Sequence, residues 1–325
     1  MRAIVFEELG GPEVLSVAEL PERRPGPGQV AVDVAYAGVN FMDLMVRSQG
    51  HRVDTLPFVP GVEVSGVVRA VGEGVTGPAP GTRVAAHLPA GGYAETAIAP
   101  ASTVFPLPDA ISLRTAAALP NVVPTAYALL HEIGRLKDGD RVLVHSAAGG
   151  VGTVAGQLAR KGGASAVYGV VSSLDKAQHA VKYGYDRVFT TDTFELEVLQ
   201  ATGGQGVDIA LDPLGGDVFG RTLSVLGRFG RIVSYGNAAG GDPWQAGYAD
   251  TATRAISVAG FSLPRLAAAD PARLRAIVDA AFAAVAAGEV EVPVTEEFEL
   301  ADAAQAHRLL ESRTSTGKLV LRVAG

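Results

Sequence analysis

The sequence contains no cysteine among its 325 residues, and this absence removes several kinds of chemistry at once. Without thiols the chain can form no disulfide, no thiolate nucleophile and no zinc site with cysteine ligands. Two common uses of cysteine, the stapling of a small secreted domain and the holding of a structural metal, are therefore excluded.

An excess of basic residues and long hydrophobic runs are missing as well. The net charge of −7 disfavours a nucleic-acid partner held by general electrostatic attraction. No segment reaches the roughly 18 consecutive apolar residues of a membrane span, and residues 1–11 do not have the basic-then-apolar layout of a signal peptide. We therefore expect a cytoplasmic protein with a small-molecule substrate and with neither nucleic acid nor membrane as a partner.

What the sequence does contain is enough apolar material for two domains. Hydrophobic residues make up 48% of the chain, and its length exceeds the size of one ordinary domain. Residues 1–100 hold short β-branched stretches between glycine and proline signals. This pattern favours a compact, antiparallel, barrel-like unit.

From about residue 113 onward, helical and strand patterns alternate. The first helical segment, residues 115–134, is expected to be interrupted at Pro120 and Pro124. Beyond it we predict strands at 142–145, 166–171, 187–190, 207–211, 231–235 and 256–261, and helices at 150–161, 174–183, 194–201 and 217–227. Strands that alternate with helices form parallel βαβ units, so we predict an α/β fold with a doubly wound parallel sheet.

The carboxyl-terminal part resumes a mixed pattern. It predicts helices at 271–287 and near 301–312 and a final strand at 318–323. We expect this last strand to return to the first domain, which would make that domain discontinuous. The expected division is a substrate domain from residues 1–117 and 262–325, and a dinucleotide-binding domain from residues 118–261.

The stretch RVLVHSAAGGVG, residues 141–152, has the layout of a dinucleotide-binding turn. An apolar run suited to a buried strand is followed by Ala147, Gly149 and Gly152 at the three positions of the fingerprint G-x-G-x-x-G, and then by a helical pattern. Because Gly149 and Gly150 have no Cβ atom, a pyrophosphate can approach the backbone, and the helix N-terminus offers unpaired N–H groups. The alternative is a tight turn without a ligand.

Seven short segments, in this order and spacing, resemble one known family. They read GVNFMD at 38–43, GVEVSG at 61–66, PTAY at 124–127, HSAAGGVG at 145–152, DPLGG at 212–216, SYGN at 234–237 and TGKLVL at 316–321. Together they resemble the zinc-free, zeta-crystallin-like quinone oxidoreductase branch of the medium-chain dehydrogenase/reductase superfamily. The resemblance spans nearly the whole chain and implies a Rossmann domain joined to a β-rich, GroES-like barrel domain.

The resemblance also implies a nicotinamide cofactor. In the family, the positions of Asn40, Thr125 and the turn at Phe261 and Ser262 lie around the nicotinamide ring. The full set of expected cofactor-binding residues is Asn40, Thr125, Ala147, Gly149, Gly150, Val151, Gly152, Ser172, Lys176, Asn237, Phe261, Ser262 and Lys318.

The end of the second predicted strand favours NADPH over NADH. An NAD site usually has an acidic residue there, whereas this strand ends in Ser172 and Ser173. A small hydroxyl leaves room for a 2′-phosphate, and Lys176 could contact it, as a lysine does in the family's NADPH-using members. The alternative is that Ser173 caps a helix and Lys176 is a surface charge, or that Asp175 binds a ribose hydroxyl.

One departure from the wider superfamily concerns the metal. Zinc alcohol dehydrogenases carry Gly-His-Glu where this chain has Gly61, Val62 and Glu63. Val62 cannot ligate a metal, so the resemblance implies a reaction without zinc. Hydride transfer from NADPH to a quinone or a related α,β-unsaturated carbonyl needs close approach in a dry site more than a dedicated nucleophile.

Three positions, Met45, His51 and Trp244, are expected on the substrate side. Met45 could pad an apolar wall, and His51 could donate a proton to the developing oxygen while Asn40 positions the reactants. The alternative for His51 is an exposed loop position without a role. Trp244, the only tryptophan, lies in a glycine-containing stretch that suggests a loop at the substrate site, although a structural anchor is equally open.

Two rival functions stay open at this point. An enoyl-thioester reductase of a biosynthetic pathway, acting on enoyl-CoA or an acyl carrier protein, would need a proton donor, for which only His51 offers itself. A protein of another class would keep the nucleotide site without turnover, like a crystallin or an RNA-binding relative, although the acidic charge argues against RNA. The resemblance further implies a homodimer paired through the uncharged residues 255–261.

Overall fold

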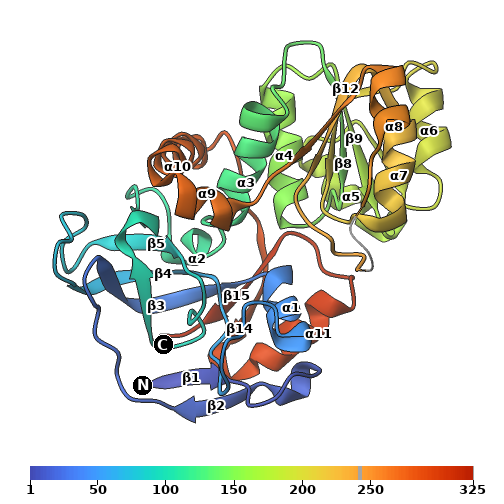
Figure 1. Ribbon diagram of the computed structural model, residues 1–325. Coiled ribbons are helices and arrows are strands. Elements are labelled where there is room, and N and C mark those ends of the chain that lie inside the picture. The colour runs from blue at the N-terminus through green and yellow to red at the C-terminus, as the bar shows by residue number, and fades with distance from the viewer. Residues whose placement is uncertain (241–243, 325) are drawn as a thin grey trace. The chain divides into compact units, whose positions relative to one another are not determined.

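The computed structural model describes residues 1–240 and 244–324, and the chain forms two compact units (Figure 1). The first unit comprises Met1–Pro124 together with the residues from Pro264 onward, and the second comprises Thr125–Leu263. Each unit has a sheet of its own, so the two are described separately.

The first unit is built on a seven-stranded, mostly antiparallel sheet. Its strand order is β14 (Val294–Glu299), β15 (Lys318–Arg322), β3 (Gln29–Val39), β4 (Glu63–Val71), β5 (Arg83–His87) and β7 (Val104–Pro106), and β6 (Thr96–Pro100) pairs with β3 as well. A separate two-stranded sheet joins β1 (Arg2–Val5) to β2 (Ser16–Glu19). The last strand, β15, pairs antiparallel with β3, which confirms that the carboxyl-terminal strand returns to the β-rich unit (Figure 1).

The core of the first unit follows from the two-residue period of its strands. In β3 the side chains of Val30, Val32 and Val34 share one face and join the hydrophobic cluster, whereas on the other face Asp33 is exposed and the small Ala31 is buried. The buried residues of β4 and β5 join the same hydrophobic cluster. This alternation is what an antiparallel sheet with one covered face requires.

Short helices connect these strands. They are α1 (Phe41–Gln49), α2 (Leu113–Ala116), α9 (Leu263–Ala269), α10 (Pro271–Ala286), α11 (Ala303–Glu311) and the 3-10 turns at Pro12–Val14, Ala101–Thr103 and Leu300–Asp302. Helix α3 (Val122–Tyr127) continues into a π-helical segment, Ala128–Ile133. The expected interruption at Pro124 is wrong, because Pro124 lies in the first turn of α3, where the backbone N–H groups have no acceptor within the helix.

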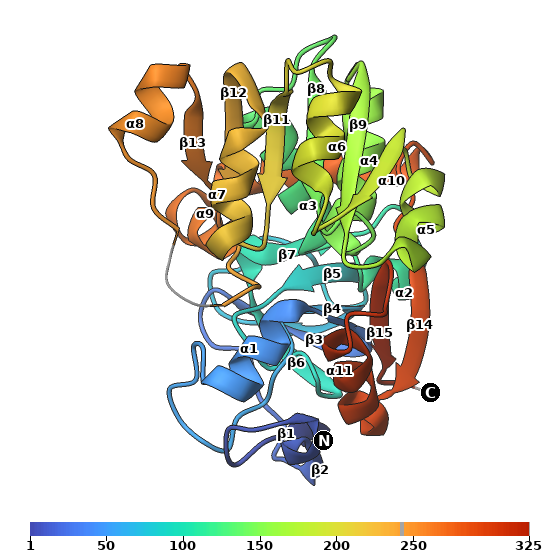
Figure 2. The same cartoon turned by 90° about the vertical axis from the view of Figure 1, so that its right-hand side faces the viewer.

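The second unit is a doubly wound α/β fold, as predicted. Its six strands are all parallel and lie in the order β10 (Arg187–Thr190), β9 (Ala166–Val171), β8 (Arg141–His145), β11 (Val207–Asp212), β12 (Leu226–Ser234) and β13 (Ser257–Gly260) (Figure 2). From β8 the chain moves outward in one direction through β9 and β10, and from β11 in the other. The strand order therefore reverses between β8 and β11, and ligands of such sheets bind at the carboxyl ends of the strands at this point.

The helices of the second unit cover both faces of its sheet. They are α4 (Gly150–Lys161), α5 (Ala177–Lys182) after the 3-10 turn Leu174–Lys176, α6 (Phe194–Ala201), α7 (Gly216–Ser224), α8 (Tyr248–Thr251) and the 3-10 turn Ala252–Arg254. Helices α4 and α5 contact each other, as do α6 and α7. Right-handed crossovers place the two pairs on opposite faces. Phe194, Val198, Phe219 and Leu223 fill the core beneath α6 and α7.

One boundary differs from the prediction. The helix expected to reach residue 227 ends at Ser224, and β12 begins at Leu226 rather than at 231. The pairing of β11 with β12 shifts register between Val207 and Ile209, so residues 227–230 form an extra bulged segment. A Cβ at Gly230 would lie 2.8 Å from the carbonyl oxygen of residue 227, a local crowding that a helical pattern does not predict.

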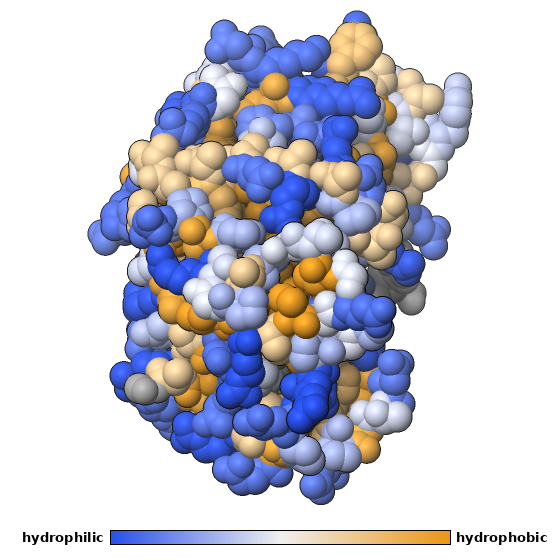
Figure 3. Space-filling view, turned by 90° about the vertical axis from the view of Figure 1, so that its left-hand side faces the viewer, coloured by the Kyte–Doolittle hydropathy of each residue, from blue (hydrophilic) through white to orange (hydrophobic). Residues whose placement is uncertain are grey.

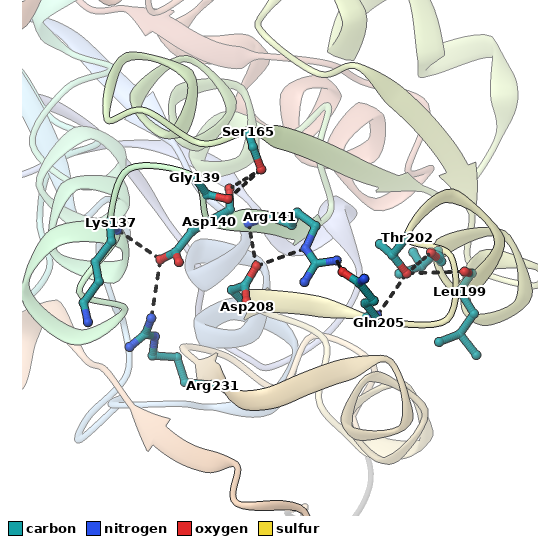
Figure 4. A network of polar contacts seen from close by, with 12 residues as sticks. Lys137, Gly139, Asp140, Arg141, Ser165, Leu199, Thr202, Gln205, Asp208 and Arg231 are labelled. Atoms are coloured by element: carbon teal, nitrogen blue, oxygen red, sulfur yellow. Dashed lines mark hydrogen bonds and ion pairs between the residues drawn. The ribbon is translucent and has the colours of Figure 1, made fainter.

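The amino ends of the parallel strands are closed by polar contacts (Figure 4). The Asp208 carboxylate accepts hydrogen bonds from the backbone N–H of Arg141 at 2.8 Å and from its Nε at 3.2 Å. The Asp140 carboxylate accepts from the backbone N–H of Lys137 at 3.0 Å and from Arg231 at 3.4 Å. These groups tie β8, β11 and β12 together at their amino ends, the ends opposite the glycine turn.

Hydrophobic and hydrophilic residues are interspersed on the face of the molecule that Figure 3 shows. Such a mixture is usual for a surface in contact with water. Among the described residues, the helices are all too short or too polar to cross a bilayer.

Candidate functional site

The glycine turn lies at the carboxyl end of β8, the strand beside the reversal of strand order. After His145 the chain turns sharply, and Ser146 has a φ of 54°, a left-handed conformation that side chains rarely adopt. The N–H of Ala147 then donates to the carbonyl of Val170 at 3.0 Å, which fixes the turn against β9. The turn therefore holds a strained residue in place, as ligand-binding turns often do.

Helix α4 starts at Gly150 with Gly149 as its N-cap. Because glycine has no side chain, it cannot cap the first N–H groups of the helix, and these remain available to a ligand. Gly152 lies in the first turn of α4, where a Cβ would come within 2.7 Å of the Cα of Ala147 and would overlap the carbonyl oxygen of Ser146. Only glycine fits there without moving the turn.

Ala147 takes the position of the first glycine of the fingerprint, and the structure has a matching space for it. A Cβ added at Gly169, on β9, would lie 2.8 Å from the Cβ of Ala147. The methyl group of Ala147, which is fully buried, thus occupies the room that the missing side chain of Gly169 leaves. The departure from the glycine pattern is accommodated by a glycine on the neighbouring strand.

Two serines and a lysine follow the end of β9. Lys176 Nζ donates to Ser172 Oγ at 3.2 Å, so the two residues predicted to contact a 2′-phosphate lie together. Ser173 caps the 3-10 turn at Leu174–Lys176, accepting from the Asp175 N–H at 3.4 Å. The Ser173 hydroxyl also donates to the Asp175 carboxylate at 3.0 Å, so this carboxylate is engaged with its own turn.

The turns after β11 and β12 lie side by side. The Asp212 carboxylate accepts from the backbone N–H of Leu214 at 2.8 Å, and burial raises the pKa of this carboxyl. Gly215 has a φ of 68°, and a Cβ there would overlap the side chain of Asn237. The close approach places Asn237 over the carboxyl end of β11.

Trp244 and Phe261 are both held at the end of β12. Trp244 Nε1 donates to Ser234 Oγ at 2.9 Å, and its ring stacks on Phe219 with the centroids 4.3 Å apart. The backbone N–H of Phe261 donates to the carbonyl of Ser234 at 2.9 Å. Trp244 is thus anchored within the second unit, and its predicted place at the substrate stays a prediction. Ser262 is exposed.

Thr125 and His145 are buried in the second unit. Thr125 lies in α3 and is 7% exposed. His145 meets Thr222 Oγ1 through Nε2 at 2.8 Å and packs edge-on against Phe194. Burial lowers the pKa of His145 to about 3, so this ring is neutral at pH 7 and serves packing.

In the first unit, Asn40 is the centre of a buried polar cluster. We call this group, made of Asn40, Glu63, Asn121 and Lys318, the Asn40 cluster. The Asn40 Oδ1 atom accepts from Lys318 Nζ at 2.8 Å and from Asn121 Nδ2 at 2.9 Å, while Asn40 Nδ2 donates to Glu63 Oε1 at 2.8 Å. The amide is therefore held at both of its ends.

Lys318 lies inside this cluster and uses all three of its donors there. Its ammonium donates to the carbonyl of Val39 and to Asn40 Oδ1, both at 2.8 Å, and pairs with Glu63 Oε1 at 2.8 Å. The side chains of Lys318 and Glu63 are 4% and 0% exposed. A direct contact of Lys318 with the cofactor stays a prediction, and what the geometry supplies is a fixed support for Asn40.

A second layer of polar groups stands behind Asn40. The Asp43 carboxylate accepts from the Asn40 N–H at 2.9 Å and from the Tyr93 hydroxyl at 3.2 Å, and burial raises the pKa of Asp43 to about 7. Tyr93 contacts His307 Nε2 at 3.2 Å, and Arg47 donates to His307 Nδ1 at 3.0 Å. Since an arginine can only donate, Nδ1 is the acceptor and Nε2 carries the hydrogen of the neutral His307 ring.

The two expected substrate-side residues of α1 differ in exposure. Met45 is half-buried in the helix, whereas His51 is exposed in the turn that follows it. A different histidine, His87, is buried opposite Glu63 in the β4–β5 pairing, and burial lowers its pKa to about 4. His87, Glu63 and Asn121 are residues of this region that the sequence did not reveal. Glu63 and Asn121 contact Asn40 directly, and the strand register places His87 opposite Glu63.

Val62, at the position of a zinc ligand in the metal-dependent dehydrogenases, is buried next to the Asn40 cluster residue Glu63. Within residues 1–240 and 244–324, no three histidine, cysteine or carboxylate side chains gather closely enough to hold a metal ion.

Comparison with known proteins agrees with the fold. Residues 26–109 match the alcohol dehydrogenase GroES-like domain, and residues 176–321 match the family described as zinc-binding dehydrogenase. The quinone oxidoreductase of Pseudomonas aeruginosa is 34% identical over 98% of this chain and 99% of that protein. The chain therefore belongs to the medium-chain dehydrogenase/reductase superfamily and, within it, to the quinone oxidoreductase family.

A relative and a solved structure extend the comparison. Mouse synaptic vesicle membrane protein VAT-1 homolog-like is 37% identical over 73% of this chain, and the match spans only 57% of that protein's length. The structure of Escherichia coli quinone oxidoreductase complexed with NADPH superposes with a TM-score of 0.92 at 32% identity, covering 99% of this chain and 100% of the other.

Proposed function

We propose that the protein transfers hydride from NADPH to a quinone or a related α,β-unsaturated carbonyl, without a metal ion. The observation that carries this proposal is the uncapped glycine turn at the head of α4, beside the point where the strand order reverses. The Escherichia coli relative, whose structure was solved with NADPH, supports the same assignment.

The glycine turn fits a dinucleotide. The absent Cβ atoms leave the backbone open to a pyrophosphate, and the N-terminus of the twelve-residue helix α4 supplies N–H donors and a partial positive charge. Ala147, Gly149, Gly150, Val151 and Gly152 would hold the diphosphate through backbone groups. When bound, NADPH would supply the hydride.

NADPH is preferred to NADH in this proposal because of the pair at the end of β9. The ammonium of Lys176 already lies against the Ser172 hydroxyl, and a 2′-phosphate could take the place of that contact. Asp175 is the group that could disfavour a phosphate, and its carboxylate is engaged by Ser173. Thr125, Asn237, Phe261 and Ser262 complete the proposed contacts of the second unit with the cofactor.

On the acceptor side the proposal assigns roles to three residues of the first unit. Asn40 would position the acceptor, and Met45 would pad its ring. The exposed His51 would donate a proton to the product oxygen, directly or through water. Val62 leaves the position of a zinc ligand without a donor atom, so a metal-free reaction fits this chain's residues.

The quaternary structure follows by analogy with the family. We propose a homodimer that pairs through residues 255–261, because β13 (Ser257–Gly260) is the edge strand of the parallel sheet. Light scattering at micromolar concentration should give the mass of a dimer. A monomer at that concentration would contradict this part of the proposal.

Loss of NADPH absorbance tests the reaction, with a naphthoquinone, a 2-enoyl-CoA or no acceptor present. We expect consumption with the naphthoquinone and little without an acceptor. Turnover of the enoyl thioester alone would favour an enoyl-thioester reductase, and binding of NADPH without any turnover would favour a nucleotide-binding protein that is not an enzyme.

A matched pair of glycine variants links this activity to the glycine turn. Gly152→Leu should abolish turnover and NADPH binding, because its side chain overlaps Ser146. Gly220→Ala, in α7, has nothing within 4 Å of the added Cβ and should retain both. If Gly152→Leu binds NADPH like the wild type, the proposed cofactor site is wrong.

A further inference from the structure

We propose that Glu63 and Lys318 are positioning residues that lock the side-chain amide of Asn40 as a hydrogen-bond donor to the carbonyl oxygen of the acceptor. This inference rests on the proposed function and adds to it the group that stabilises the charge formed during hydride transfer. The evidence lies in which atoms of the Asn40 cluster can donate and which can accept.

The ammonium of Lys318 identifies which end of the Asn40 amide is the oxygen. Asparagine oxygen and nitrogen atoms have nearly the same shape, so their assignment must come from their partners. Lys318 carries only donors, and its Nζ lies 2.8 Å from one end of the Asn40 amide. That end must be the oxygen, and Asn121 Nδ2 gives it a second donor at 2.9 Å.

The carboxylate of Glu63 identifies the other end of the Asn40 amide as the nitrogen. An ionised carboxylate only accepts, and Glu63 Oε1 lies 2.8 Å from Asn40 Nδ2. Its Oε2 accepts from the backbone N–H of Asn121 at 2.9 Å, which fixes the carboxylate itself. Rotating the Asn40 amide by half a turn would set oxygen against carboxylate and N–H against ammonium, so the two charges enforce one orientation.

The backbone of Asn40 is fixed as well. Asn40 is the N-cap of α1, with extended backbone angles, and its N–H donates to the Asp43 carboxylate at 2.9 Å. The side chain therefore starts from a rigid point and ends between two fixed charges. Such double support holds a group to the precision that a reacting site needs.

What remains free on Asn40 is a donor. Both lone pairs of Oδ1 are taken by Lys318 and Asn121, and one hydrogen of Nδ2 is taken by Glu63. Within the described part of the chain, the second Nδ2 hydrogen has no acceptor, and Asn40 keeps a small exposed fraction of 5%. A ligand that reaches Asn40 thus meets an N–H group.

This donor matches the charge that the reaction creates. When the hydride bonds to the electron-poor carbon of an enone or quinone, the conjugated π electrons move onto the carbonyl oxygen, and NADPH becomes NADP⁺. A fixed N–H aimed at that oxygen stabilises the anion more than the neutral acceptor. The oxygen or carbon then takes its proton from solvent or an acid, and Asn40 keeps its own.

A buried ion pair alone gives little reason for this arrangement. Moving two charges out of water costs as much as their attraction returns in many proteins, so stability by itself does not explain Glu63 and Lys318. Orientation of a neighbouring amide does explain them, since a group that only donates and a group that only accepts each fit one end of Asn40.

A double-mutant cycle on the turnover number tests the inference. Asn40→Ala should lower kcat for the naphthoquinone by about 100-fold, the usual loss of one oxyanion donor. Glu63→Gln should lower it by a smaller factor, because Lys318 still holds the amide oxygen. Because Glu63 acts through Asn40, the double variant should lose no more than Asn40→Ala alone. For Glu63→Gln, the dissociation constant of NADPH, from fluorescence, should stay within about twofold of the wild type.

A second variant is needed to separate an effect on kcat from a loss of stability, because Glu63→Gln leaves the Lys318 charge buried without a carboxylate partner. The double substitution Glu63→Gln with Lys318→Met removes both charges and lets residue 63 face Asn40 in either sense. We expect this double variant to fold and to show the same loss in kcat as Asn40→Ala. Glu299→Gln, which removes an exposed partner of Arg322, is the control and should keep wild-type turnover.

A binding measurement gives a readout that does not depend on turnover. With NADP⁺ bound no hydride is available, so acetophenone and ethylbenzene can be compared as probes that differ in one carbonyl group. Asn40→Ala and the charge-free double variant should weaken acetophenone binding and leave ethylbenzene binding unchanged, as measured by calorimetry.

The outcomes separate this inference from the function on which it rests. A wild-type protein that reduces neither naphthoquinone nor enone would overturn the proposed function. An active wild type whose Glu63→Gln and charge-free variants keep their kcat would overturn the positioning role alone. Losses that multiply in the Asn40→Ala, Glu63→Gln double variant would likewise show that Glu63 acts independently of Asn40.

Discussion

The two units use their site lysines in opposite ways. Lys318 of the first unit is 4% exposed and spends its three donors on Val39, Asn40 and Glu63. Lys176 of the second unit lies on a turn at the end of a strand, with its ammonium on the exposed Ser172. We propose that the buried ammonium orients its neighbours, whereas the half-buried Lys176 would exchange the Ser172 hydroxyl for a cofactor phosphate.

The same contrast extends to how each unit builds its site. The second unit offers backbone groups at the head of α4, which any diphosphate can use without side-chain chemistry. The first unit offers side chains whose donors and acceptors are already matched to one another. In the proposed function, binding of a constant cofactor and orientation of a variable acceptor would thus use different physical means.

Removing the ammonium group of each lysine should change the stability of the protein by very different amounts, which tests this contrast most directly. Lys318→Met should lower the free energy of unfolding by about 3–5 kcal/mol, because it leaves the Glu63 carboxylate buried without its partner. Lys176→Met should change it by only about 0.5 kcal/mol, as at most surface positions. Urea denaturation of both variants beside the wild type checks this, and equal effects would show that the two lysines do not differ as described.

The preference for NADPH over NADH should change when Lys176 is substituted. Lys176→Ala should raise the KM for NADPH by roughly 10- to 100-fold, since a charge-assisted hydrogen bond contributes about 1.5–3 kcal/mol. The KM for NADH should stay within about twofold, because NADH has no 2′-phosphate. Steady-state kinetics with both cofactors measures the ratio, and Lys182→Ala, on α5 beside Tyr183, is the matched control.

If Lys176→Ala raises both KM values equally, the lysine does not recognise the phosphate. In that case the alternative in which Lys176 is a surface charge would account for the residue, and the cofactor preference would have to come from elsewhere.

Acid should weaken the protein through its buried histidines. Burial lowers the pKa of His145 and His307 to about 3 and that of His87 to about 4, so the folded state leaves them neutral while the unfolded state protonates them below about pH 6.5. Stability from these groups is complete above pH 6.5 and is lost as the pH falls toward 4. Each contributes a slope of about 1.4 kcal/mol per pH unit.

Asp43 has the opposite sign. Burial raises its pKa to about 7, so between about pH 4 and 7 the unfolded state releases a proton that the folded state keeps, and stability falls as the pH rises. Urea unfolding at pH 5.0 and 6.0 should therefore show a net gain with pH. His145→Phe should reduce this gain in unfolding free energy by about 1.4 kcal/mol, the effect of one proton per pH unit, and Asp43→Asn should increase the gain. A flat profile in the wild type would contradict the pKa assignments.

The smallest expected effect concerns His51. Because this side chain is exposed, water can replace it as a proton source, so His51→Phe should lower kcat by only about tenfold or less. Unchanged rates with quinone and enoyl substrates would leave His51 as a surface residue without a catalytic role.

Sequence reasoning worked best where one pattern determines one local structure. The alternation of strands and helices predicted the parallel sheet, and the spacing of Ala147, Gly149 and Gly152 predicted the turn before α4. It failed at the start of β12, because the bulge at residues 227–230 depends on pairing with β11. It also misplaced the effect of Pro124, which depends on the residue where α3 begins.

The sequence by itself determined the fold class, the family and the glycine turn, because these follow from periodicity and short-range spacing that the chain carries wherever it is placed. Only the tertiary structure decided how Asn40 is held, since Glu63, Asn121 and Lys318 come from β4, the segment before α3 and the last strand. Burial, and the acceptors that folding brings near a lysine, decide whether it orients a neighbouring side chain or binds a ligand. No local pattern contains that information.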